Sequence, residues 1–312
     1  MNSRKLAGPG FPVIKLSKEW LALAALFVGA TAIATAPLFV RFSETGPVAT
    51  AFWRVFLALP VLWIWAMASD GGGHWRSVRA HPGMLLLIGF CFAGDLAVWH
   101  WSILLTSVAN ATLLSNLAPI FVALGAWLLF RDTPKKLFLG GLAAALTGTA
   151  LLISAGSGQS ASSHSGHALF GDALGVITAM FYAGYQMAVT RLRAHVATAT
   201  LMAWSCLVMS ALLLPVAWLS GEQILPQTAA GWITVIALAL IAQVAGQSLI
   251  AWAMAHLPAT FSSVGLLWQP VAATLLAWLL IGETMGTLQF AGGLLVLAGI
   301  ALARRSAQKN IS

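Results

Sequence analysis

Long apolar runs separated by short polar breaks dominate the pattern of this chain. Ten runs approach or exceed the roughly 20 residues that an α-helix needs to cross a hydrocarbon core. They are predicted at residues 19–38, 47–68, 83–104, 108–130, 137–155, 169–190, 196–219, 229–254, 259–281 and 287–303. The runs are continuous rather than alternating, which indicates helices and not the strands of a barrel. The sequence therefore predicts an all-α integral membrane protein with ten transmembrane helices.

Composition agrees with a chain that lies mostly in lipid. Of the 312 residues, 60% are hydrophobic and 8% are charged, where soluble domains have roughly 45–50% and about 25%. These values exclude a soluble enzyme, a nucleic-acid-binding domain and a disordered scaffold, so no nucleic acid partner is expected despite a net charge of +8. Cys91 and Cys206 lie inside apolar runs and are interpreted as small packing residues.

Basic side chains are distributed unequally between alternate breaks. With the amino terminus inside, fourteen of the sixteen Lys and Arg residues fall on the inner side, whereas Arg41 lies outside and Arg54 within a span. The positive-inside rule then places both termini in the cytoplasm. Because the chain has no long soluble domain, we expect the cell (inner) membrane as its location. A cleavable signal peptide is the alternative for the first run, because Ala34-Thr35-Ala36 imitates a cleavage site. The run continues to Val40, which favours a retained helix.

The chain also resembles itself at a constant offset of 151 residues. The matched pairs include Pro119 with Pro270, Trp127 with Trp278, Gly141 with Gly292 and Gly148 with Gly299. The fourth and fifth helices therefore correspond to the ninth and tenth. Two five-helix units in series face opposite ways because five is odd, and inverted repeats are typical of secondary transporters that work by alternating access. A duplication kept only for packing is the simpler alternative.

The repeat divides the chain into five parts. We predict a cytoplasmic tail at 1–18, a first repeat at 19–155, an external linker at 156–168, a second repeat at 169–303 and a cytoplasmic tail at 304–312. The second repeat would begin from the outer side, so the two units would be inverted relative to each other.

One motif occurs in both repeats. A proline is followed eight residues later by tryptophan and then by an acidic residue and threonine, P-x7-W-x4-[DE]-T, at 119–133 and at 270–284, each time before a Gly-rich helix. With Arg54 in the second helix, this pattern resembles the EamA-type members of the drug/metabolite transporter superfamily. The resemblance implies ten helices, cytoplasmic termini and export of small metabolites, but no particular substrate. The first motif departs from the family in reading RDT where the second reads GET.

Charged side chains within the spans are candidate functional groups, because a charge at mid-membrane costs about 2.5–3.5 kcal/mol. Arg54, Asp95 and Asn116 come out at roughly 10–12 Å below the outer surface at 1.5 Å per residue. An Arg54–Asp95 pair could clasp helices two to four. Alternatively, Asp95 faces a cavity beside Trp99 and takes up a proton during transport.

The remaining candidates are aromatic and amide side chains, which suit an amphipathic or zwitterionic solute. The predicted substrate-binding residues are Asp95, Trp99, Asn116, Tyr182, Tyr185, Gln186, Gln243, Gln247, Trp268 and Gln269. Arg54 and Asp95 are predicted structural or coupling groups. Pro119 and Pro270 are predicted gating kinks, because proline removes a helical hydrogen bond. Ordinary hydrogen bonds between helices and fixed bends are the competing interpretations.

We therefore expect a secondary transporter that exports amino acids or related amphipathic solutes, driven by the solute gradient or by protons. The sequence has no phosphate-binding Gly-Lys motif and no nucleophile with its base, so we expect no enzyme activity, no catalytic residue, no cofactor and no metal. The expected partners are a small solute and the lipid bilayer. The alternatives are a membrane enzyme acting on a lipid-like substrate and a proton-coupled multidrug efflux pump. The second half has no acidic counterpart of Asp95, which weakens the pump hypothesis.

Overall fold

A computed structural model of the chain describes residues 18–70, 73–106, 108–156, 166–282 and 285–308. Within these residues every regular element is a helix, and ten helical spans are long and apolar enough to cross a membrane, which confirms the predicted all-α, ten-span architecture. In chain order the spans are Lys18–Phe42, Pro47–Ser69, Pro82–Leu105, Asn110–Leu129, Lys136–Ser154, Ala168–Leu192, Thr198–Leu219, Ala229–Ala253, Ala259–Leu280 and Thr287–Ala307. Glu283 and Thr284 of the second motif, most of the predicted linker, residues 1–17 of the first predicted tail and residues 309–312 of the second lie outside the described residues.

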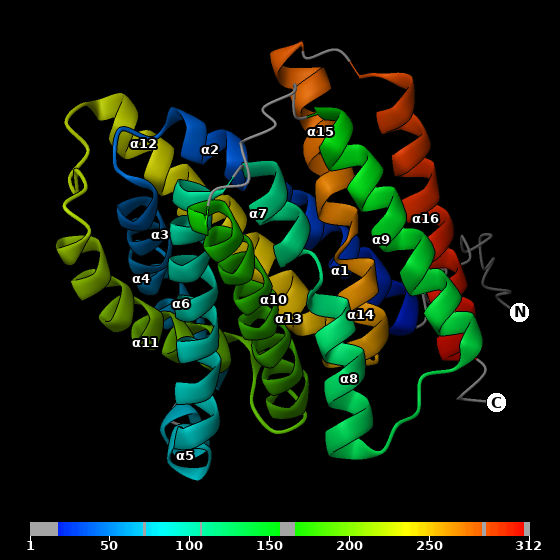
Figure 1. Cartoon of the computed structure of the whole chain (residues 1–312). Helices are drawn as coiled ribbons and strands as arrows, with labels where there is room; N and C mark the ends of the chain where they lie inside the picture. The colour runs from blue at the N-terminus through cyan, green and yellow to red at the C-terminus, as the bar shows by residue number, and fades with distance from the viewer. Residues whose placement is uncertain (1–17, 71–72, 107, 157–165, 283–284, 309–312) are drawn as a thin grey trace, which may run out of the picture.

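Several spans consist of more than one helix (Figure 1). In spans 1 to 5 these are α1 (Lys18–Ala34) and α2 (Ala36–Phe42), α3 (Pro47–Phe56) and α4 (Leu59–Asp70), α6 (Pro82–Leu105), α7 (Val108–Ser115) and α8 (Ala118–Phe130), and α9 (Lys136–Gly156). In spans 6 to 10 they are α10 (Gly166–Leu192), α11 (Thr198–Leu219), α12 (Ala229–Leu238) followed by η1 (Ala239–Gln247) and α13 (Ser248–Ala253), α14 (Ala259–Gly265) and α15 (Trp268–Ile281), and α16 (Thr287–Gln308). The short helix α5 (Gly73–Ala80) connects spans 2 and 3.

Proline explains the breaks in spans 1, 2, 4 and 9. In each of them the second helix restarts with Pro37, Pro60, Pro119 or Pro270 among its first three residues. Proline has no N–H to give to the preceding turn and its ring crowds that turn, so the helix ends and begins again. At the break in span 9, the carbonyl oxygen of Leu266 accepts the N–H of Gln269 at 2.9 Å, a bond between residues three apart that closes a tighter turn than that of an α-helix.

Span 8 is irregular for another reason. Its central segment η1 is a π-helix, whose wider turns carry Gln243 and Gln247. π-Helical turns occur frequently at functional sites. No proline lies within η1, and the hydrophobic pattern of the span did not predict it.

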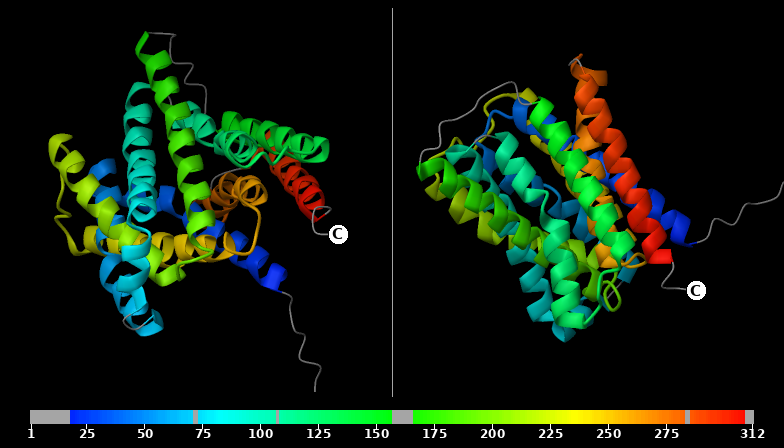
Figure 2. Two further views of the ribbon diagram at one scale, coloured as in Figure 1. Left: turned by 90° about the horizontal axis from the view of Figure 1, so that it is seen from below. Right: turned by 45° about the vertical axis from the view of Figure 1, so that its right-hand side comes forward.

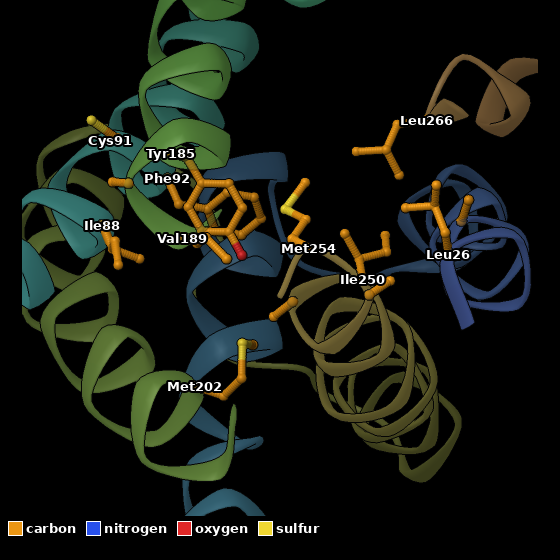
Figure 3. Packing of buried hydrophobic residues seen from close by; sticks show 14 of the residues in the cluster. Leu26, Ile88, Cys91, Phe92, Tyr185, Val189, Met202, Ile250, Met254 and Leu266 are labelled. Carbon is orange, nitrogen blue, oxygen red and sulfur yellow. The ribbon is translucent and has the colours of Figure 1, made fainter. Parts of the chain in front are cut away.

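Ten spans return the chain to the side on which it starts. We call the face where α1 begins and α16 ends the terminal face, and the opposite face, which carries the connection between spans 1 and 2, the linker face. Figure 3 shows buried side chains that pack in the interior from helices of both halves. Near the terminal face, Val189 of span 6, Met202 of span 7 and Met254, which directly follows span 8, are buried.

Helices α9 and α16 lie side by side (Figure 1) and meet through glycines. A Cβ atom added at Gly141 would lie 2.7 Å from the carbonyl oxygen of Gly299, and one added at Gly148 would lie 2.6 Å from that of Gly292. Residue numbers rise along one helix as they fall along the other, so the two helices are antiparallel. The offset of 151 residues converts each of these two contacts into the other, since it matches Gly141 with Gly292 and Gly148 with Gly299.

Candidate substrate cavity

A cavity with a volume of about 640 Å³ lies between the two halves of the chain. Spans 1 to 4 line it from the first half, and spans 6, 8 and 9 line it from the second. Its lining reaches Arg41 and Pro47 at the linker face and Gln247 in the middle of span 8. On span 6 the lining ends at Gln186, and the buried Val189 follows toward the terminal face. The cavity therefore opens toward the linker face.

Most of the residues predicted to form the site line this cavity. Those that line it are Arg54, Asp95, Trp99, Asn116, Pro119, Tyr182, Gln186, Gln247, Gln269 and Pro270. Tyr185, Gln243 and Trp268 are not among the lining residues. The side chains that sequence reasoning missed include Phe92, one helical turn before Asp95, and Thr178, one turn before Tyr182. Both could have been found from the sequence, because residues three or four positions from a predicted residue lie on the same face of the helix.

Arg54 forms a hydrogen bond to a side chain in the second half of the chain. Its side chain is 8% exposed, and its Nε–H donates to Oε1 of Gln243 at 3.0 Å. Nε2 of Gln243 in turn lies 3.3 Å from the sulfur of Cys206. Gln243 therefore positions the guanidinium from behind, and Arg54 keeps further N–H donors beside the cavity.

Asp95 and Arg54 are not joined in this structure. Among the residues that the structure describes, no hydrogen bond or ion pair links the Asp95 carboxylate to another side chain. Arg54 instead bonds to Gln243, and its guanidinium carbon lies 5.8 Å from the centre of the Phe92 ring. No hydrogen-bonded clasp of helices two to four is formed by this pair, although Arg54 and Asp95 line the same cavity and interact electrostatically across it.

Aromatic rings form one wall of the cavity. The ring centres of Phe92 and Tyr185 are 4.7 Å apart, and the rings of Tyr182 and Tyr185 are nearly parallel with centres 6.0 Å apart. The Tyr185 hydroxyl, which is buried behind this wall, accepts a hydrogen bond from Nε2 of Gln247 at 2.6 Å. Tyr185 therefore orients a lining residue without lining the cavity itself.

Three lining glutamines carry buried polar atoms without partners among the described residues. Gln186 is 1% exposed and neither atom of its amide is hydrogen-bonded. Oε1 of Gln247 and Nε2 of Gln269 are also unpaired. Leaving such a group unpaired costs about 1–3 kcal/mol, so a solute or water that supplied the missing partners would stabilise this wall.

The other predicted residues have local partners. Trp268 donates its Nε1–H to the hydroxyl of Thr31 at 2.9 Å and so packs α15 against α1. Asn116 lies in the break between α7 and α8, where Nδ2 donates to the carbonyl of Thr112 at 2.8 Å. Pro119 and Pro270 follow the two broken turns that border the cavity.

Two carboxylates at the linker face were not identified from the sequence. Glu222 accepts the N–H groups of Val48 and Ala49 at 2.9 and 3.1 Å, at the start of α3. Glu44 accepts those of Gln227 and Thr228 at 2.8 and 3.0 Å, just before α12, together with the hydroxyl of Thr228. These bonds from Thr228 and Gln227 favour the ionised form and lower the pKa of Glu44. Each carboxylate thus caps a helix that begins in the other half.

Comparisons with known proteins agree with this architecture. The sequence profile of the EamA-like transporter family matches residues 19–154 and 169–305. An uncharacterized transporter from Archaeoglobus fulgidus is 26% identical over 274 residues, covering 84% of this chain and 89% of that protein. The pseudopaline exporter CntI from Pseudomonas aeruginosa is 27% identical over 222 residues, covering 71% and 75%. A solved crystal structure superposes with a TM-score of 0.78 at 20% identity, covering 93% of this chain and 99% of that one, which shows a shared fold.

Proposed function

The chain belongs to the EamA-like transporter family, and from that membership we propose that it exports small organic metabolites across the inner membrane by alternating access. The proposed substrates are amino acids or related amphipathic, zwitterionic solutes. A relative named as an exporter of pseudopaline supports export rather than uptake. The relatives named above are described as transporters and not as enzymes.

The observation that carries the substrate class is that Arg54 and Asp95 line one cavity with no hydrogen bond or ion pair joining them. Asp95 offers a carboxylate to an ammonium group, and Arg54 offers its remaining N–H donors to a carboxylate. Phe92 and Tyr182 provide an apolar surface for the body of the solute. A zwitterion would satisfy both charges, whereas a simple amine would leave the arginine without an anionic partner.

Two features support alternating access. The antiparallel contact of α9 with α16 repeats itself under the 151-residue offset, as expected if the halves are inverted copies. Spans 4 and 9, which correspond under the same offset, are both broken beside the cavity at Pro119 and Pro270. Broken helices at membrane depth are tolerated where they border a cavity. We assign these two breaks as the gates that exchange the opening between faces.

The distribution of basic residues supports a cytoplasmic terminal face, since positive side chains gather on the cytoplasmic side. In that orientation the cavity opens to the outside, the state in which an exporter releases its substrate. Asp95 is the one group proposed to couple transport to protons, because its carboxylate lines the cavity and is bonded to no other described side chain. A proton taken up there would weaken its hold on an ammonium group.

Counterflow into proteoliposomes tests the proposed function. The purified protein is reconstituted with a panel of zwitterionic amino acids, amines and nucleosides, with and without a pH gradient. We expect exchange of at least one apolar amino acid, and faster exchange when the gradient is imposed. Exchange of amines alone would contradict the zwitterionic substrate class and favour a multidrug pump. Exchange of none of the panel would overturn the proposed transport function.

A further inference from the structure

A second cavity lies at the terminal face, apart from the substrate cavity. Its volume is about 200 Å³, and it is formed by the start of α1, the connection between α13 and α14, and the end of α16. Figure 2 shows the start of α1 beside the end of α16 in its right-hand view. The lining residues are Lys18, Glu19, Leu23, His256, Leu257, Pro258, Phe261, Arg304 and Ala307.

Two permanent positive charges and one acid line this small cavity. Lys18 and Arg304 are cationic, Glu19 is anionic, and His256 adds a ring nitrogen. Nδ1 of His256 lies 3.0 Å from the carbonyl of Trp252, which leaves Nε2 as the nitrogen available to a ligand. The floor is apolar, because Leu23, Leu257 and Phe261 are buried. The cavity therefore combines charged side chains of net positive charge with buried apolar side chains.

Arg304 is positioned in a way that points to an anionic ligand. Its guanidinium carbon lies 4.1 Å from the centre of the Trp20 ring, which holds the planar group in place. Its Nε atom is buried and has no hydrogen-bond partner among the described residues. A guanidinium presents its N–H donors in a fork that matches a phosphate, and Arg304 lines the cavity, so an anion there would meet the donors at the end of this side chain.

We propose that this cavity binds the phosphate headgroup of an anionic membrane lipid such as phosphatidylglycerol. A lipid fits better than free phosphate because apolar side chains line the cavity together with the charged ones. Trp20, which is 54% exposed beside the cavity, is of the residue type that anchors proteins at the headgroup level. Basic pockets between spans on the cytoplasmic side are suited to anionic headgroups. The assignment of this lipid to the cytoplasmic leaflet depends on the proposed orientation of the protein. The proposal that the cavity binds an anionic lipid does not depend on it.

The bound headgroup links elements of both halves. Lys18 belongs to span 1, His256 to the connection between spans 8 and 9, and Arg304 to span 10. Since the substrate cavity opens at the opposite face, a ligand that ties these elements together stabilises the closed terminal face. The lipid therefore favours the state open toward the linker face.

Lipid titration of the purified full-length protein in neutral detergent tests the site. Bound phosphatidylglycerol is counted by native mass spectrometry, with phosphatidylcholine and inorganic phosphate as separate arms. We expect phosphatidylglycerol to bind selectively and Arg304→Ala to weaken its apparent affinity about fivefold, the effect of losing one basic side chain near a lipid surface. Arg305→Ala is the matched control, because Arg305 is the next residue, is exposed and does not line the cavity.

The outcomes separate the possibilities. Equal weakening by Arg304→Ala and Arg305→Ala would reduce the effect to general surface charge and overturn the site. Equal binding of phosphatidylcholine would also overturn it, as would complete displacement of phosphatidylglycerol by inorganic phosphate. If Arg304→Ala does not fold, Lys18→Ala provides the same comparison at an exposed side chain. Native mass spectrometry measures lipid binding and requires no transport activity. The lipid result can therefore be interpreted even if the transport assay contradicts the proposed function.

Discussion

The two halves of the chain contribute different chemistry to one cavity. Among the described residues, the first half supplies all three charged side chains that line the cavity, Arg41, Arg54 and Asp95, whereas the second half supplies no charge and three amides, those of Gln186, Gln247 and Gln269. The two halves are alike, in contrast, where α9 packs against α16, because the glycine contacts between these helices repeat under the internal offset. Packing preserves the repeat where backbones touch, and the binding surface has diverged where a solute is proposed to lie.

The difference divides the roles within the proposed site. Charges from the first half would select the class of solute, since an unpaired charge in a low-dielectric cavity strongly favours the opposite charge. Amides from the second half would adjust affinity within that class through hydrogen bonds. Changes to the charged wall, to the shared scaffold, to the amide wall and to the reciprocal caps should therefore have effects of decreasing size.

The largest effect is expected at Asp95. In the Asp95→Asn variant no hydrogen bond to a described side chain is lost, so the fold should persist, while the ammonium of a zwitterion loses its anionic partner. Losing a buried charge partner costs about 2 kcal/mol or more, which is roughly a 30-fold rise in KM. Counterflow kinetics in proteoliposomes measure this rise, and the pH dependence of transport should disappear with it.

A matched solute provides the control for Asp95→Asn. An analogue of the transported amino acid that lacks the ammonium group should be exchanged equally by wild type and variant. Retention of pH-dependent transport by Asp95→Asn would refute the coupling role of this carboxylate.

The scaffold should respond next, through stability rather than specificity. Gly148→Val places a branched side chain against backbone, since even a Cβ atom would lie 2.6 Å from the carbonyl oxygen of Gly292. Overpacking of this kind costs about 1–3 kcal/mol. We expect the thermal unfolding midpoint in detergent to fall by several degrees. Gly140→Val on the same helix is the control, because nothing lies within 4 Å of a Cβ at that position. Equal destabilisation by the two variants would contradict the close contact.

The amide wall should show a smaller effect of a different kind. Gln186→Leu removes two polar atoms that have no partner among the described residues, so stability should be unchanged or slightly higher. If the amide binds solute, KM should rise about fivefold, the equivalent of one hydrogen bond of about 1 kcal/mol. Unfolding midpoints and counterflow kinetics measured together separate the two effects. A loss of stability without a change in KM would assign Gln186 to packing.

Much of the fold could be predicted because lipid imposes simple rules on sequence. A helix must be apolar and long enough to cross, so the ten spans were visible as runs. The breaks were less visible, because proline does not always interrupt a helix. Pro215 lies inside the continuous helix α11, whereas Pro37 and Pro60 follow breaks. The π-helical segment in span 8 depends on packing against neighbouring helices, which the hydrophobic pattern of one span does not record.

The site was predicted as a set of residue types and less well as a geometry. Depth along each span placed Arg54 and Asp95 at one level of the membrane, and both line one cavity, but depth says nothing of the direction in which a side chain points. In spans that are apolar all round, no polar face reveals how a helix is turned. Tyr185 and Gln243 therefore looked like lining residues, although the structure places them behind Gln247 and Arg54 as supports.

The smallest effect is expected at the linker face, where each half caps a helix of the other. The hydrogen bonds to Glu44 lower its pKa below the ordinary 4.5, so the cap stabilises the fold above that pH and loses its contribution as the pH falls through the lowered value. Glu44→Gln should therefore reduce the unfolding midpoint slightly at pH 7 and not at all in strong acid. Glu222→Gln, which changes the reciprocal cap at α3, should produce a similar small loss at pH 7. If the two caps act as a pair, the double variant should lose more than the sum of the single variants, whereas strict additivity would mean that the two halves are fastened independently.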